Sequence, residues 1–192
     1  VGFGQGASAK PALCVFSKHL QWITGYVELG ERIAAMGFDG VDLTVRPGGH
    51  VLPERVAEDL PRAHEAISKV GLGVPMITTN VTDPRQPETR KILKTASALG
   101  IRFYRRPGEV WGNSNNPLRR IAELQPRLRE LVALNKDYGL FAGIHNHSGY
   151  GVGATPWEVH ELVKNFDPRY LGSNFDIGHA SIEGAYGGWR SG

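Results

Sequence analysis

The 192-residue chain contains a single cysteine, Cys14. One thiol cannot form an internal disulfide, so a disulfide-stabilised scaffold is excluded. Cys14 lies in the apolar run 12–16, which favours a small buried residue over a reactive thiol.

Long apolar runs and a strong excess of charge are also missing. No apolar run approaches the roughly 20 residues that a membrane-spanning helix needs. The 22 basic residues are mixed with 19 acidic ones, and basic clusters are short, such as the pairs Arg105-Arg106 and Arg119-Arg120. We therefore expect no nucleic-acid partner and no membrane partner.

The N-terminal segment has an unusual composition. Residues 1–10 begin small and apolar, and Ala7-Ser8-Ala9 has the A-x-A form that precedes signal-peptide cleavage. We expect this segment to be a flexible N-terminus or the remnant of a signal peptide. The expected location is the cytoplasm, or the periplasm if these residues mark a cleavage site.

Six apolar, β-rich runs alternate with amphipathic helical patterns. The runs are residues 12–16, 40–45, 74–79, 101–105, 140–145 and 170–176. Thr155-Pro156-Trp157-Glu158 forms a capping box that opens the last of the helical patterns. Strands that alternate with helices predict a parallel sheet, and no linker interrupts residues 11–192, so we expect one α/β domain.

Two α/β architectures fit this alternation. A doubly wound sheet normally carries a glycine-rich phosphate-binding loop after its first strand, and the sequence has none. The run ends recur at about 30 residues and carry polar side chains, as a (β/α)₈ TIM barrel requires. We predict a TIM-barrel type with about six βα units in this chain, hence a fragment that lacks roughly two units and is inactive alone.

Ionisable side chains follow the last two runs. Asp176 and His179 end the 170–176 run, where burial is costly unless such groups are paired or bind a metal. His145 and His147, two residues apart, would point to the same side of an extended segment. We predict a shared site in which His145 and Asp176 hold a divalent ion, although backbone-bonded loop histidines are an alternative.

Three further polar residues follow earlier runs. His19 could bind substrate hydroxyls or cap its loop, and Arg46 could hold an anionic or polar substrate group or form a surface salt bridge. Arg105 ends the fourth run. Asp42 is expected to face the pocket, whereas no pattern supports a role for Glu109.

These motifs resemble the xylose-isomerase-like TIM-barrel superfamily, in particular its sugar phosphate isomerase/epimerase branch. The resemblance runs from Phe16-Ser17-Lys18-His19 through Gly37-Phe38-Asp39-Gly40-Val41-Asp42 to Phe175-Asp176-Ile177-Gly178-His179. It implies a divalent metal ion (Mn, Zn, Mg or Co) with Asp176 as a ligand and His179 facing the substrate. It also implies a further histidine and glutamate ligand on two strands that would follow Gly192.

The sequence departs from this family at one position. Many members carry a metal-binding glutamate where His145 stands, and the epimerases use two glutamates to move the proton. The form His-x-His-x-Gly at 145–149 is similar to inosose-dehydratase-type members instead.

We therefore expect a metal-dependent sugar or polyol isomerase/epimerase that transfers a proton next to a carbonyl. The expected catalytic residues are His145, His147 and His179, and the expected substrate contacts are His19, Arg46, Arg105 and His179. Three alternatives remain open: an inosose-dehydratase-like lyase, an abasic-site endonuclease-like phosphodiesterase and a non-catalytic polyol-binding protein. The expected partner is a small sugar or polyol.

Overall fold

The computed structural model describes residues 10–114, 116–149 and 151–183. The strands in them are β1 (Cys14–Phe16), β2 (Gly40–Val45), β3 (Gly73–Thr79), β4 (Phe103–Arg106), β5 (Phe141–His145) and β6 (Leu171–Asn174). The helices are α1 (Tyr26–Ala35), α2 (Val56–Lys69), α3 (Pro87–Ala98), α4 (Pro117–Tyr138), α5 (Pro156–Val163) and α6 (Ile177–Glu183). All six expected strands are confirmed, whereas the expected N-terminal segment 1–10 lies outside the described residues except for Lys10.

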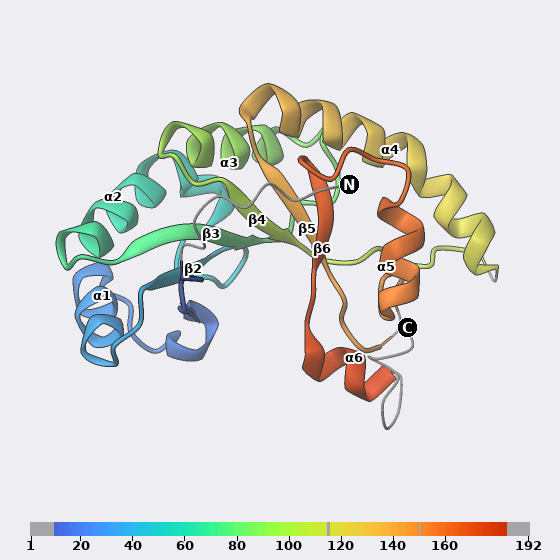
Figure 1. Ribbon diagram of the computed structural model, residues 1–192. Coiled ribbons are helices and arrows are strands. Elements are labelled where there is room, and N and C mark those ends of the chain that lie inside the picture. The colour runs from blue at the N-terminus through green and yellow to red at the C-terminus, as the bar shows by residue number, and fades with distance from the viewer. Residues whose placement is uncertain (1–9, 115, 150, 184–192) are drawn as a thin grey trace.

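The strands form one parallel sheet in the order β1-β2-β3-β4-β5-β6. Each strand pairs with the next one in the sequence, as in the wall of a TIM barrel, whereas a doubly wound sheet would reverse its order. Figure 1 shows a curved sheet with α1 to α5 following one another along its outer side. This arrangement confirms the TIM-barrel type with six βα units.

One face of the sheet forms the core with these helices. The strand register aligns a row of side chains that are at most 1% exposed. The row consists of Leu43, Ile77, Tyr104, Ala142 and Leu171. Because side chains alternate along a strand, the residues between these point to the opposite face. That face is less covered: Phe103 is 48% exposed and lines a cavity of about 380 Å³ with Cys14 and Met76.

A short segment precedes each of α2 and α6. The segment from Pro53 begins as a 3₁₀ turn, Pro53–Arg55, and α2 starts at Val56. The 170–176 run ends as a strand at Asn174, earlier than expected, and α6 begins at Ile177, so Gly178 lies in a helical turn. No described helix combines the length and the apolar character needed to cross a bilayer.

The capping box before α5 also shapes the loop that follows β5. The Thr155 hydroxyl accepts a hydrogen bond from the Glu158 backbone N–H at 3.2 Å, which confirms the predicted box. The Glu158 carboxylate also accepts hydrogen bonds from the backbone N–H groups of Gly153 and Ala154, at 3.0 and 2.9 Å. A single carboxylate therefore fixes both the helix start and the end of the loop.

Glu109, for which no sequence pattern indicated a role, joins three parts of the fold. Its carboxylate forms ion pairs with Arg106 of β4 and with Arg127 of α4. Its backbone exchanges two hydrogen bonds with Val152 in the loop after β5, at 2.8 and 2.7 Å. Arg106 is fully buried, so Glu109 compensates a charge that would otherwise be isolated from water.

Replacing Glu109 should therefore destabilise the fold strongly. We expect Glu109→Gln to lower the free energy of unfolding by roughly 3 kcal/mol, because Arg106 would remain charged and buried. The matched control is Glu123→Gln, whose exposed pairs with Arg119 and Arg120 should contribute about 0.5 kcal/mol or less. Urea unfolding of the protein in its full natural length measures both values, and equal losses in the two variants would contradict this account.

Candidate active site

The carboxyl ends of the strands surround a cavity of about 340 Å³. Residues from each of the six strands line it, as is typical of the catalytic face of a TIM barrel. All but one of the predicted site residues line this cavity: His19, Arg105, His145, His147, Asp176 and His179. The exception is Arg46, whose guanidinium carbon lies 5.8 Å from the ring centre of the cavity residue Phe16.

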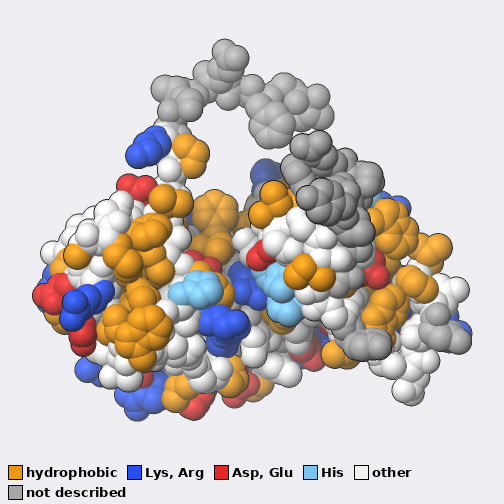
Figure 2. Space-filling view, turned by 90° about the horizontal axis from the view of Figure 1, so that it is seen from below, with side chains coloured by type: hydrophobic (Ala, Val, Ile, Leu, Met, Phe, Trp, Pro, Cys, Tyr) orange, Lys and Arg blue, Asp and Glu red, His pale blue; other side chains and the backbone are white. Residues whose placement is uncertain are grey.

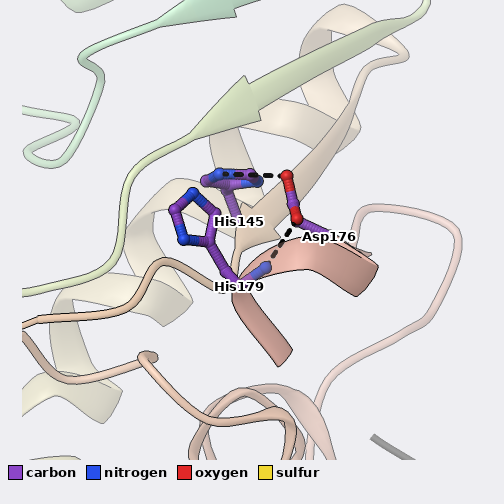
Figure 3. A group of neighbouring side chains, drawn as sticks. All are labelled: His145, Asp176 and His179. Atoms are coloured by element: carbon purple, nitrogen blue, oxygen red, sulfur yellow. Dashed lines mark hydrogen bonds and ion pairs between the residues drawn. The ribbon is translucent and has the colours of Figure 1, made fainter. Parts of the chain in front are cut away.

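Three of these residues form a compact group (Figure 3). Asp176 Oδ2 lies 4.0 Å from Nε2 of the buried His145. One ligand atom from each of His145, Asp176 and His179 lies within 4.8 Å of the others. The three residues come from the end of β5, the β6–α6 connection and the first turn of α6.

Asp176 is positioned through its backbone. The side-chain amide of the buried Asn146 donates to the Asp176 carbonyl at 2.7 Å and accepts from the Asp176 N–H at 2.7 Å. The Asp176 carboxylate in turn accepts a hydrogen bond from the His179 N–H at 2.9 Å. Partial burial acts to raise the pKa of Asp176, but this hydrogen bond and the nearby imidazoles lower it below its ordinary value of 3.8.

His145 is held in its neutral form. Burial lowers its pKa to about 4, and the charge of Arg105 acts in the same direction. Its imidazole therefore keeps a free nitrogen lone pair near neutral pH, which metal coordination requires. Nδ1 of His145 is buried and has no hydrogen-bond partner among the described residues.

His147 and His179 stack with ring centres 4.0 Å apart, and their hydrogen bonds imply opposite tautomers. Nδ1 of His147 contacts the Ser148 carbonyl oxygen at 2.9 Å, so this nitrogen carries the proton and Nε2 is the acceptor. Nδ1 of His179 accepts from the backbone N–H and the hydroxyl of Ser148, at 3.3 and 2.8 Å. The neutral His179 ring therefore carries its proton on Nε2.

Comparison with known proteins identifies the family of the chain. The family model described as "Xylose isomerase-like TIM barrel" matches residues 31–189. The chain belongs to this family. The match spans most of the chain and includes the ends of β2 to β6.

Solved structures support the same fold for this xylose-isomerase-like chain. A D-tagatose 3-epimerase-like protein is 23% identical, with a TM-score of 0.65, over 90% of this chain and 67% of its own. A probable 3-DHS dehydratase from Bacillus anthracis is 16% identical, with a TM-score of 0.70, over 91% and 66%. The IOLI protein, solved with a bound zinc atom, is 15% identical, with a TM-score of 0.69, over 88% and 64%. The chain thus spans about two thirds of the length of these structures.

The donor set of this family member suits a divalent cation. His145 is neutral, Asp176 is ionised near neutral pH, and their donor atoms approach each other closely. Zinc, manganese and related ions accept such mixed imidazole and carboxylate ligands. The particular roles assigned to His19, Arg46, Arg105, His145, His147, Asp176 and His179 stay predictions.

Sequence reasoning assigned no role to two residues that orient the predicted ones. Asn146 fixes Asp176, and Ser148 fixes the tautomers of His147 and His179. Both lie in the polar stretch 145–149 directly after a buried strand, and that position is the only signal that the sequence offered for them.

Asp42 lies on the wall of the cavity, as expected. Both of its carboxylate oxygens lie 2.9 Å from the Thr78 hydroxyl, which donates to them. Burial raises the pKa of Asp42 to about 7, against the hydrogen bond from Thr78 and the charges of Arg105 and Arg46. A substantial fraction of Asp42 is therefore protonated near neutral pH.

This raised pKa predicts a pH-dependent stability. Between about pH 4 and 7 the folded protein holds a proton that the unfolded chain has released, so the stability falls as the pH rises through this window. Asp42→Asn removes this titration and should raise the free energy of unfolding at pH 8 by roughly 1 to 3 kcal/mol relative to wild type, with little change at pH 4.

Denaturant unfolding at several pH values checks this expectation. The matched control is Asp137→Asn, a change at an exposed carboxylate in α4. An identical pH profile for Asp42→Asn and wild type would mean that Asp42 ionises in the folded protein as readily as in the unfolded chain.

Proposed function

We propose that this protein is a divalent-metal-dependent enzyme that moves a proton next to the carbonyl of a sugar or polyol, as an isomerase or epimerase does. The observation that supports this most is the grouping of two kinds of side chain in one cavity. His145 and Asp176 form a pair of metal donors 4.0 Å apart, and the stacked pair His147 and His179 lies beside them.

In this proposal His145 and Asp176 hold the ion. A bound divalent ion supplies Lewis acidity, which polarises the carbonyl and hydroxyl oxygens of a substrate. His145 suits a ligand because its pKa of about 4 keeps it neutral, and Asn146 holds Asp176 in place. As a ligand, His145 contributes to catalysis only by holding the ion.

The proton transfer then falls to His147 and His179. Nε2 of His147 is a hydrogen-bond acceptor on an exposed ring, so it can take a proton from a substrate carbon. Nε2 of His179 carries a proton that it can donate to a substrate oxygen. Enolisation needs a base that removes the proton from the carbon next to the carbonyl and a donor that protonates the carbonyl oxygen, and neighbouring rings with one acceptor and one donor supply both. His19, Arg46 and Arg105 would contact the rest of the substrate.

A dehydratase is the second candidate. The stretch His145-Asn146-His147 is similar to that of inosose-dehydratase-type members, and one structural neighbour is described as a probable 3-DHS dehydratase. Such an enzyme begins with the same proton removal and then expels a hydroxyl group as water. The two candidates therefore share the residues and differ in the product.

Removing the carboxylate of Asp176 should weaken metal binding. We expect Asp176→Asn to reduce zinc affinity by roughly tenfold or more in the protein of full natural length, measured by calorimetric titration. The control Asp167→Asn alters a surface carboxylate paired with Arg169 and should leave the affinity unchanged. Wild-type affinity in Asp176→Asn would remove Asp176 from the proposed ligands.

Removing the basic Nε2 of His147 should slow proton transfer without weakening metal binding. We expect His147→Gln to lower the exchange of carbon-bound hydrogen with solvent roughly 100-fold or more, with zinc affinity unchanged. The control His160→Gln changes an exposed histidine in α5 and should leave both properties unchanged.

The substrate panel for this measurement contains ketoses, aldoses and an inosose, with the protein loaded with manganese or zinc. Loss of water from the substrate would favour the dehydratase. Stoichiometric metal without either exchange or elimination on the panel would contradict the proposed activity.

A further inference from the structure

Two guanidinium groups lie around the aromatic ring of Phe16, which lines the cavity. The guanidinium carbon of Arg105 lies 5.5 Å from the ring centre of Phe16, and that of Arg46 lies 5.8 Å from it. Arg105 projects from β4 and Arg46 directly follows β2. The Thr79 hydroxyl donates to the Arg105 carbonyl at 2.9 Å and so fixes the backbone from which this guanidinium extends.

Neither guanidinium has a hydrogen bond or an ion pair with another described residue. Nε of Arg105 is buried and unpaired in this part of the chain. The carboxylate of Asp42, whose charge acts on Arg105, instead accepts a hydrogen bond from the Thr78 hydroxyl. A buried guanidinium donor without a partner is costly, because it has lost water without gaining another acceptor.

The charges around the cavity favour binding of an anion beside Arg105. Lys18 and Arg105 line the cavity together with Asp42 and Asp176. Because burial keeps part of Asp42 protonated near neutral pH, positive charge exceeds negative charge even before a metal ion is added. Figure 2 shows Lys and Arg side chains between two groups of histidine side chains on this face.

We propose that the substrate carries an anionic group, a carboxylate or a phosphate, which Arg105 binds with the help of Arg46 while the rest of the molecule reaches His145 and Asp176. A planar guanidinium matches either anion through paired, charge-assisted hydrogen bonds. This inference rests on the proposed function, in which the other end of the substrate meets a metal ion held by His145 and Asp176. It narrows the substrate class to sugar acids or sugar phosphates.

Binding of paired probes to the metal-free protein tests the inference. D-Gluconate and D-sorbitol differ in a single carboxylate, and D-glucose 6-phosphate and D-glucose differ in a single phosphate. We expect the protein of full natural length, in EDTA, to bind at least one anion roughly tenfold or more tightly than its neutral counterpart at fixed ionic strength. The anion that shows the larger preference identifies the source of the charge.

The preference should depend on Arg105. We expect Arg105→Met to bring the affinity ratio of each probe pair close to one, while the control Arg129→Met, an exposed arginine of α4, leaves it unchanged. If Arg105→Met fails to fold by circular dichroism, Arg105→Gln serves in its place. Equal binding of anion and neutral probe by wild type, or a preference that persists without Arg105, would overturn the proposal.

Because EDTA removes metal from this measurement, its outcome is independent of the metal experiments. Loss of anion preference would leave the metal-dependent function standing. Conversely, a protein that binds no zinc could still show the anion preference, and the proposed function alone would then fail.

Discussion

Two hydrogen bonds between the side-chain amide of Asn146 and the backbone of Asp176 determine the geometry of the candidate site. The last register pair of β5 and β6 is His145 with Asn174, so the sheet itself no longer aligns the chain at Asp176. The side chain of the buried Asn146 takes the place of strand pairing here, because it forms two hydrogen bonds of 2.7 Å with the Asp176 backbone. The Asp176 carboxylate is thereby held opposite His145, and the chain enters α6 at the point that brings His179 alongside. A shift of this backbone would separate all three side chains at once.

Burial then decides which of these groups are charged. It lowers the pKa of His145 and raises that of Asp42, and each shift favours the neutral form of the group. Asp176 escapes this effect because backbone hydrogen bonding stabilises its carboxylate. Burial also lowers the pKa of Arg105, but a guanidinium keeps its proton under physiological conditions. The cavity therefore keeps both a charged carboxylate, Asp176, and a charged guanidinium, Arg105, among its lining residues.

The sequence predicted the strands well, because apolar runs and helical periodicity are local signals, and the polar residues after those runs identified the carboxyl-end rim. The parts that could not be predicted depend on contacts between distant segments. Asn146 meets Asp176 across 30 residues, and Glu109 meets Arg127 across 18. Nothing near Glu109 in the sequence indicates that an arginine on a later helix will face it. The helix that begins at Ile177 was also not predicted, because Gly178 is a poor helix former and the hydrogen bond from the His179 N–H to the Asp176 carboxylate is visible only in the structure.

Arg105 and His145 interact electrostatically across the cavity that both line. Its charge helps to lower the pKa of His145, so the guanidinium favours the neutral imidazole that can serve as a ligand. A glutamate at position 145 would offer Arg105 a carboxylate nearby and would compete with any anion for it. With histidine there, the guanidinium attracts an anion without a competing charge on β5. An anion bound at Arg105 would offset this charge and weaken its effect on the pKa of His145, so the anion and the imidazole would be coupled electrostatically.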